Sequence, residues 1–165
     1  MKNKFRVRTI ELLCNLLEIT GVLLVLFMTL AFQFILQELP CPLCLFQRVG
    51  MFCVALGFLM NMRFGLRPSH YAMIILGALY TSFVALRQVA LHILPGAPGF
   101  GAPFLGLHLY TWSFIVSIII IVVTTLMMGV DRQYLPLHAK HSRYRWLVHS
   151  LFAITVLLIL FNIYT

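Results

Sequence analysis

Cys41 and Cys44 form the most chemically specific pattern in the 165-residue sequence, a Cys-Pro-Leu-Cys turn. Two cysteines separated by two residues can close a disulfide within one turn. At the start of a helix, the unpaired N–H groups and the positive end of the dipole stabilise a thiolate. Pro42 suits the first helical position, where no backbone donor is needed. The pair therefore predicts thiol–disulfide chemistry at the start of a helix.

Three further residues are candidates for binding a cofactor near this pair. Arg48 lies one turn after Cys44 on the same helix face, where a guanidinium can stabilise a thiolate or an anionic reduced acceptor. Arg87 and His92 belong to a later apolar segment, and with Gln88 we expect them to face the same pocket. Alternatively, Arg48 only extends to the aqueous interface and Arg87 forms a polar clamp between helices.

Metal binding is an alternative use of the cysteine pair. A structural zinc site needs about four ligands, and the nearby candidates besides the pair are only His92 and His108. We therefore expect no metal site. Cys14 and Cys53 lie inside apolar segments, where we expect each to behave as a small buried hydrophobic residue rather than as a redox partner.

The elements that position these residues are predicted to be membrane-spanning helices. Hydrophobic residues make up 62% of the sequence and charged residues 10%, which is too apolar for a water-soluble domain of this size. A hydrocarbon core about 30 Å thick needs roughly 20 apolar residues in a helix. Five segments meet or nearly meet this length: residues 12–36, 45–62, 71–93, 107–130 and 146–164. We predict an all-α bundle in the lipid bilayer, forming one membrane domain over residues 1–165.

The distribution of Lys and Arg predicts the orientation of this bundle. A net charge of +8 would suggest nucleic-acid binding in a soluble protein, but here the basic residues lie between the apolar segments, so we exclude nucleic acid. They occupy residues 1–8, 63–67 and 132–145. By the positive-inside rule the N-terminus is cytoplasmic, the cysteine pair lies outside, and a fifth span puts the C-terminus outside. The first apolar segment is too long for a signal peptide and has no small-residue cleavage site, so we expect a retained span.

The loop over residues 94–106 is rich in Pro and Gly and almost without polar side chains. Such a loop is not helical, and we expect it to lie at the outer membrane interface. It is either a short connector or an apolar lid over whatever binds near the cysteine pair.

The stretch from Phe32 and Gln33 through the Cys-Pro-Leu-Cys turn to Arg48 resembles the start of the bacterial disulfide-bond-formation family DsbB. The resemblance implies a four-helix enzyme of the bacterial inner membrane. Such an enzyme oxidises a periplasmic thioredoxin-like dithiol protein and passes the electrons to ubiquinone or menaquinone. It also implies that Cys44 contacts the quinone with the help of Arg48.

The sequence departs from this family in two ways. The family carries a second cysteine pair in the outer loop between spans three and four, but residues 94–106 contain no cysteine. The family also has four spans, whereas residues 146–164 suggest a fifth. Either the partner dithiol reacts directly with the Cys41–Cys44 disulfide, or this relative has another task.

Three functional hypotheses follow. The first is a quinone-linked thiol oxidoreductase in which Cys41 receives the external thiol attack and Cys44 faces the quinone. The second is a non-catalytic membrane subunit of a larger complex, with the fifth span as the docking element. The third is copper or haem handling at the outer face by Cys41, Cys44, His92 and His108.

Overall fold

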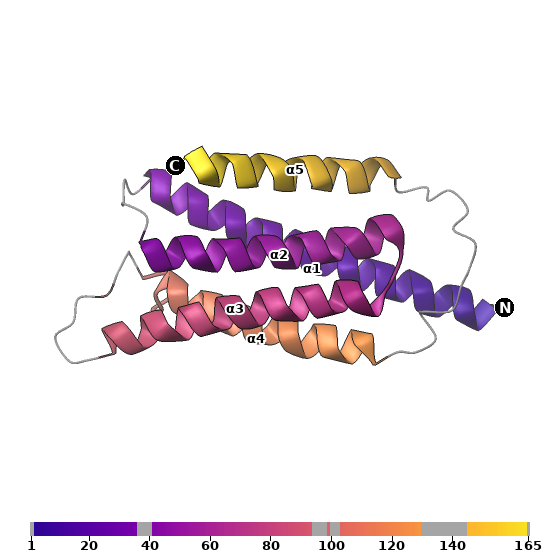
Figure 1. Cartoon of the computed structure of the whole chain (residues 1–165), viewed down its shortest axis with the longest axis horizontal. Helices are drawn as coiled ribbons and strands as arrows, with labels where there is room; N and C mark the ends of the chain where they lie inside the picture. Colours follow the sequence, from indigo (N-terminus) through magenta and orange to yellow (C-terminus); the bar gives the residue numbers. More distant parts are fainter. Residues whose placement is uncertain (1, 36–40, 94–98, 100–102, 130–144, 165) are drawn as a thin grey trace.

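The computed structural model describes residues 2–35, 41–93, 99, 103–129 and 145–164, which contain five helices (Figure 1). These are α1 (Lys2–Ile35), α2 (Pro42–Phe64), α3 (Pro68–His92), α4 (Leu109–Met128) and α5 (Arg145–Tyr164). The same residues contain one isolated antiparallel bridge, between Phe104 and Leu107, and no strand. The predicted all-α class is confirmed.

Four of these helices are long and apolar enough to cross a membrane. Their candidate spans are Leu13–Ile35, Pro42–Phe64, Pro68–His92 and Leu109–Met128. The apolar part of α5, Trp146–Asn162, is shorter, so the fifth span stays a prediction. α1 begins well before the predicted span because the helix continues into the basic N-terminal segment, which apolar length does not detect.

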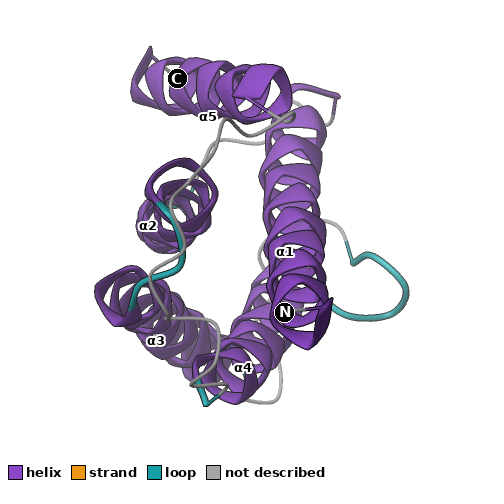
Figure 2. Ribbon diagram, turned by 90° about the vertical axis from the view of Figure 1, so that its right-hand side faces the viewer, coloured by secondary structure: helices purple, strands orange, loops and turns teal. Residues whose placement is uncertain are grey.

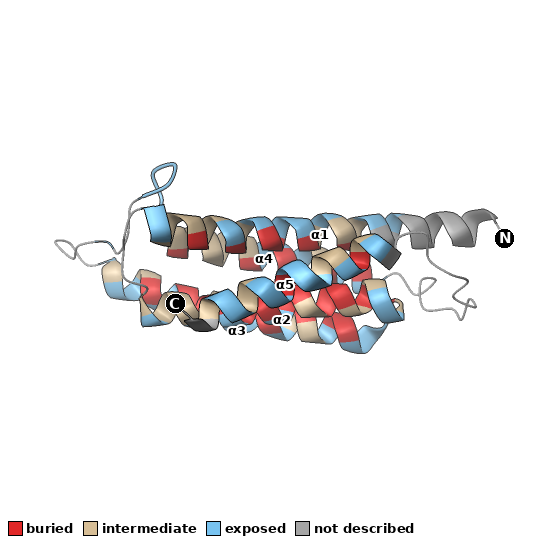
Figure 3. Ribbon diagram, turned by 90° about the horizontal axis from the view of Figure 1, so that it is seen from above, coloured by how far each residue is buried: buried red, intermediate tan, exposed pale blue. Residues whose placement is uncertain are grey.

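The helices form a bundle in which α2 lies between α3 and α5 (Figure 2). α2 packs against α3, α3 against α4, and α1 and α5 both lie against α2 (Figures 1 and 2). Buried residues gather on the inward faces of the helices, and exposed residues face outward (Figure 3). Outward side chains such as Leu17, Phe83 and Leu126 are large and apolar, which suits contact with lipid.

A buried polar network ties α1, α2 and α3 together at the end of α2 away from the cysteine pair. Asn61 donates to Asn15 Oδ1 at 3.0 Å, and Asn15 donates to the Tyr71 hydroxyl at 3.3 Å. His70 Nδ1 lies 3.1 Å from Asn61 Oδ1. Since these buried amides have partners, the network holds the three helices in register instead of destabilising the core.

Glycine allows the backbones of α2 and α3 to approach closely. A Cβ at Gly77 of α3 would lie 2.9 Å from the Gly50 carbonyl oxygen and 3.1 Å from the Val54 nitrogen, both backbone atoms of α2. Backbone atoms move only with their helix, so any side chain at Gly77 must push the two helices apart.

We therefore expect Gly77→Ala to destabilise the bundle by roughly 1–3 kcal/mol, because the added methyl group overpacks the α2–α3 contact. The measurement is thermal unfolding in detergent. Gly21→Ala is the matched control, since a Cβ at Gly21 of α1 would meet nothing within 4 Å and alanine favours a helix. Equal unfolding temperatures for the two variants would contradict the close approach.

Candidate active site

The cysteine pair begins α2. Cys41 is the N-cap residue, with extended backbone angles of φ −66° and ψ 136°, and Pro42 occupies the first turn. The Leu45 nitrogen donates to the Cys41 carbonyl oxygen at 3.1 Å, which closes the first turn around Cys44. Both thiols are free and half-buried. The turn therefore places both sulfurs beside the unpaired N–H groups of a helix start, and the helix begins at Pro42 as expected.

A fully buried amide from α3 joins the two sulfurs. The Gln88 Nε2 atom donates to Cys44 Sγ at 3.5 Å and to Cys41 Sγ at 3.7 Å. Gln47 Nε2 donates to Gln88 Oε1 at 2.7 Å, which turns the amide so that its N–H groups face the sulfurs. Since a thiolate accepts hydrogen bonds, this amide can stabilise negative charge on either cysteine.

Arg48 of α2 is buried between α1 and α5. Its side chain is only 7% exposed, so it does not extend to the interface. Nη1 donates to Gln33 Oε1 at 2.7 Å and to Asn162 Oδ1 at 3.1 Å, and Nη2 donates to the Thr29 carbonyl oxygen at 3.3 Å. All three acceptors are neutral. The buried Nε–H has no hydrogen-bond partner among the described residues.

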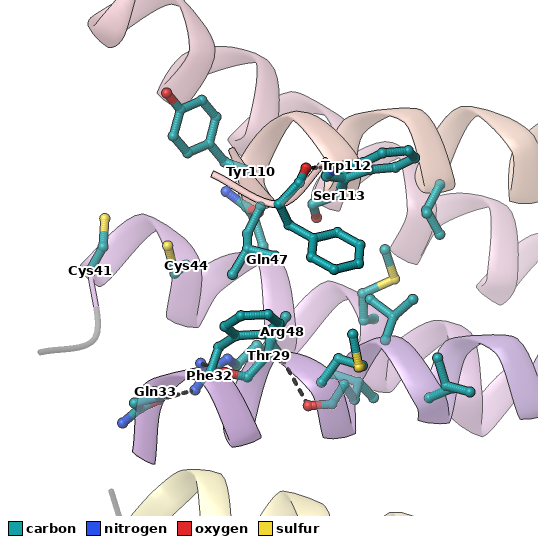
Figure 4. A pocket seen from close by; sticks show the side chains of 18 residues that line it. Thr29, Phe32, Gln33, Cys41, Cys44, Gln47, Arg48, Tyr110, Trp112 and Ser113 are labelled. Carbon is teal, nitrogen blue, oxygen red and sulfur yellow. Dashed lines mark hydrogen bonds between the residues drawn. The ribbon is translucent and has the colours of Figure 1, made fainter. Parts of the chain in front are cut away.

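An apolar cavity of about 240 Å³ connects the cysteines with Arg48 (Figure 4). Figure 4 shows the two cysteines at one end of this cavity, with aromatic side chains from α1 and α4 around it. The lining comes from α1, α2, α4 and the residue Phe104; its polar and aromatic members are Thr29, Phe32, Gln33, Cys41, Cys44, Gln47, Arg48, Phe104, Tyr110, Trp112 and Ser113. The cavity therefore suits a flat apolar molecule that carries a few hydrogen-bonding oxygens.

The sequence profile of the family "Disulfide bond formation protein DsbB" matches residues 11–101, more than half of the chain. The chain belongs to the DsbB family. The predicted membership is thus confirmed, and it assigns the chain to membrane disulfide-bond formation. Comparison with curated proteins and with solved structures gives no significant match. The matched region contains the cysteine pair, Arg48 and Gln88, whereas α4 and α5 lie outside it.

The other two predicted cofactor residues of this DsbB-family chain are placed differently. Arg87 is exposed on the outward face of α3 and does not line the cavity. Gln88, the next residue, points inward, because successive helical residues are rotated by about 100°. His92 is half-buried; its Nδ1 donates to the Gln88 carbonyl oxygen at 2.8 Å, and its ring stacks on Tyr110 with centroids 5.5 Å apart. His92 thus does not line the cavity itself but contacts Tyr110, which does.

Phe104 covers the cavity of this DsbB-family chain from the loop before α4. Its ring packs edge-on against Phe32 at 5.9 Å between centroids. The Trp112 indole donates to the Phe104 carbonyl oxygen at 2.9 Å, and Phe104 exchanges two backbone bonds with Leu107 across a tight turn. This turn supports the lid hypothesis, although residues 94–98 and 100–102 of the loop lie outside the described residues.

The remaining cysteines and histidines do not extend the site. Cys14 is half-buried and Cys53 is exposed, and neither lines the cavity. The expectation that Cys53 is buried is wrong, because its side chain is exposed at the edge of the α2–α3 contact, beside Gly77. Within the described ranges, no group of three or more His, Cys, Asp or Glu side chains is arranged to hold a metal ion. Metal or haem handling therefore gains no support from the structure.

Gln88 and Asn162 are the site residues whose contacts sequence reasoning missed. Gln88 was placed near the pocket through its spacing from His92, but nothing in the sequence indicated that its amide bridges both sulfurs. Asn162 is an amide residue near the end of an apolar helix. A polar side chain in such a helix often faces the bundle interior, and this was the signal that could have indicated its role.

Proposed function

We propose that this DsbB-family chain is a quinone-linked thiol–disulfide oxidoreductase. It takes two electrons from a periplasmic thioredoxin-like dithiol protein through Cys41 and Cys44 and passes them to ubiquinone or menaquinone. The proposal depends on one observation: the amide-bridged cysteine pair opens onto an apolar cavity that is also lined by a buried arginine, whose acceptors among the described residues are neutral.

The residues around the cavity fit a quinone. Phe32, Phe104 and Trp112 provide apolar and aromatic surfaces for a ring, and Arg48 provides a buried Nε–H donor for a ring oxygen. When bound, a quinone accepts two electrons and two protons and becomes a quinol. The protein's part is to bind the ring, exclude water and hold the thiolate beside it.

The thiol exchange begins from the oxidised pair. A thiolate of the partner attacks Cys41 Sγ, the Cys41–Cys44 bond breaks, and Cys44 leaves as a thiolate. The second partner thiol then attacks the mixed disulfide, which releases the oxidised partner and a reduced Cys41. Gln88 donates to both sulfurs, so its amide can stabilise the negative charge on whichever of the two cysteines is the thiolate. Since residues 94–106 contain no cysteine, the partner reacts with Cys41 without an intermediate pair.

We further propose the inner membrane as the location, with a cytoplasmic N-terminus and with the pair and the C-terminus in the periplasm. Arg63 and Arg67 are exposed at the end of the bundle away from the pair, which supports this orientation. α5 runs antiparallel to α2: Val148 and Arg63 line one groove, while Asn162 reaches Arg48. α5 thus covers most of the length of a candidate span, which supports a fifth span.

The test is the redox state of the pair in cells. We expect Cys41 and Cys44 to be oxidised when quinone is present and to accumulate as thiols when quinone synthesis is blocked. Acid quenching, denaturation and alkylation with a mass tag report both states. Cys14 and Cys53 should be tagged in both samples and serve as the internal standard. A pair that stays reduced in quinone-replete cells would refute the proposal.

A further inference from the structure

The last helix, α5, lies outside the family-matched region and contributes an atom to the site. Asn162, near the end of α5, accepts a hydrogen bond from Arg48 Nη1 at 3.1 Å through its Oδ1. Gln33 of α1 accepts from the same nitrogen at 2.7 Å. The neighbouring Phe161 packs against Phe34 of α1 with ring centroids 5.2 Å apart. α1, α2 and α5 therefore meet at the Arg48 guanidinium.

The three bonds to Arg48 fix the direction of its remaining donor. A guanidinium is planar, so anchoring Nη1 by two amide oxygens and Nη2 by the Thr29 carbonyl also sets where the Nε–H points. That Nε–H is buried without a hydrogen-bond partner among the described residues, and Arg48 lines the cavity. A buried donor of this kind is costly unless a ligand can satisfy it.

The chemistry of the anchors also preserves the charge of Arg48. Amide and carbonyl oxygens accept hydrogen bonds without carrying a negative charge, whereas a carboxylate would neutralise the guanidinium. A cation held in this way can still attract a thiolate or a reduced, anionic acceptor in the cavity.

We propose that Asn162 is a positioning residue for the quinone site and that α5 is an in-chain part of this site. Asn162 holds the guanidinium so that its unpaired Nε–H and its positive charge stay beside the cavity and can act on a molecule bound there. This inference rests on the proposed function. It gives the fifth helix a role within its own chain instead of docking to a larger complex.

The kinetic test compares two variants of α5 in the full-length purified protein. Asn162→Leu keeps the side-chain size and removes the acceptor; we expect the KM for ubiquinone to rise about tenfold while the KM for the dithiol partner stays unchanged. Leu160→Ala is the matched control, because Leu160 is an exposed residue of α5 two positions from Asn162 and does not line the cavity. It should retain the wild-type KM for ubiquinone.

A second test measures the position of α5 by cysteine cross-linking and does not depend on enzyme activity. In full-length protein with the four native cysteines replaced by serine, Gln33→Cys with Asn162→Cys should form a cross-link with a short bifunctional thiol reagent. Gln33→Cys with Trp146→Cys should not, since Trp146 lies at the other end of α5.

The outcomes separate this inference from the proposed function. An active wild-type protein combined with an unchanged KM for ubiquinone in Asn162→Leu would overturn the positioning role. Absence of the cross-link between positions 33 and 162 would overturn the placement of α5. A wild-type protein that does not reduce quinone would instead refute the proposed function, and the positioning role with it.

Discussion

Cys44→Ser is expected to abolish quinone reduction and to form a stable mixed disulfide with a partner variant that lacks its second cysteine. Cys41 alone has no disulfide to offer, so the single thiol of this partner variant is first converted to a disulfide with an aromatic thiol. The Cys41 thiolate attacks the partner sulfur and displaces the aromatic thiolate, and no second partner thiol then resolves the new bond. We expect turnover to fall by at least about a thousandfold, since neither Cys14 nor Cys53 lines the cavity. The trapped species is measured as a band on non-reducing gels that disappears on reduction.

Cys41→Ser distinguishes the roles of the two cysteines. It should lose turnover to the same extent but form little mixed disulfide, because the sulfur that receives the external attack is absent. Cys53→Ser should behave as the wild type, since Cys53 is exposed and does not line the cavity. Full turnover by the double variant Cys41→Ser with Cys44→Ser would refute thiol chemistry at this pair.

The spans of this bundle could be predicted from sequence because lipid imposes a length on apolar segments. This rule located four spans and the helix at residues 146–164. It did not give the helix ends: α1 extends to Lys2 and α2 begins at Pro42, where backbone hydrogen bonding and the proline decide the boundary.

The local part of the site was also predictable. The spacing of Cys41, Cys44 and Arg48 is a property of one helix, so a single turn places them together. The face that α3 turns inward was not predictable in the same way. In a helix that is apolar on all sides, hydrophobic periodicity does not indicate which polar residue faces the interior. The sequence therefore favours Arg87 as a cofactor residue, whereas in the structure Gln88 is the residue of α3 whose side chain faces the cysteine pair.

Long-range contacts account for the remaining features. Asn162 meets Arg48 across 114 positions of sequence, and Phe104 covers the cavity through its contacts with Phe32 and Trp112. Neither contact has a spacing rule, because each depends on how separate helices pack.

Arg48→Met is expected to lower kcat/KM for quinone by about a hundredfold. The substitution removes the positive charge and the buried donor, and it leaves the acceptor oxygens of Gln33, Asn162 and Thr29 without their partner. The transfer of electrons from the dithiol partner to the cysteine pair should change much less, because Gln88 still donates to both sulfurs. Stopped-flow measurement of each half-reaction separates the two effects.

Arg48→Lys and Arg87→Met complete this test. Lysine restores the charge but not the planar fork that serves three acceptors, so we expect a loss of about tenfold. Arg87→Met makes the same chemical change on the outward face of α3 and should leave the quinone half-reaction unchanged. A large loss in Arg87→Met with normal kinetics in Arg48→Met would reverse the assignment: the cation that serves the cavity would then belong to α3, as the sequence alone favoured.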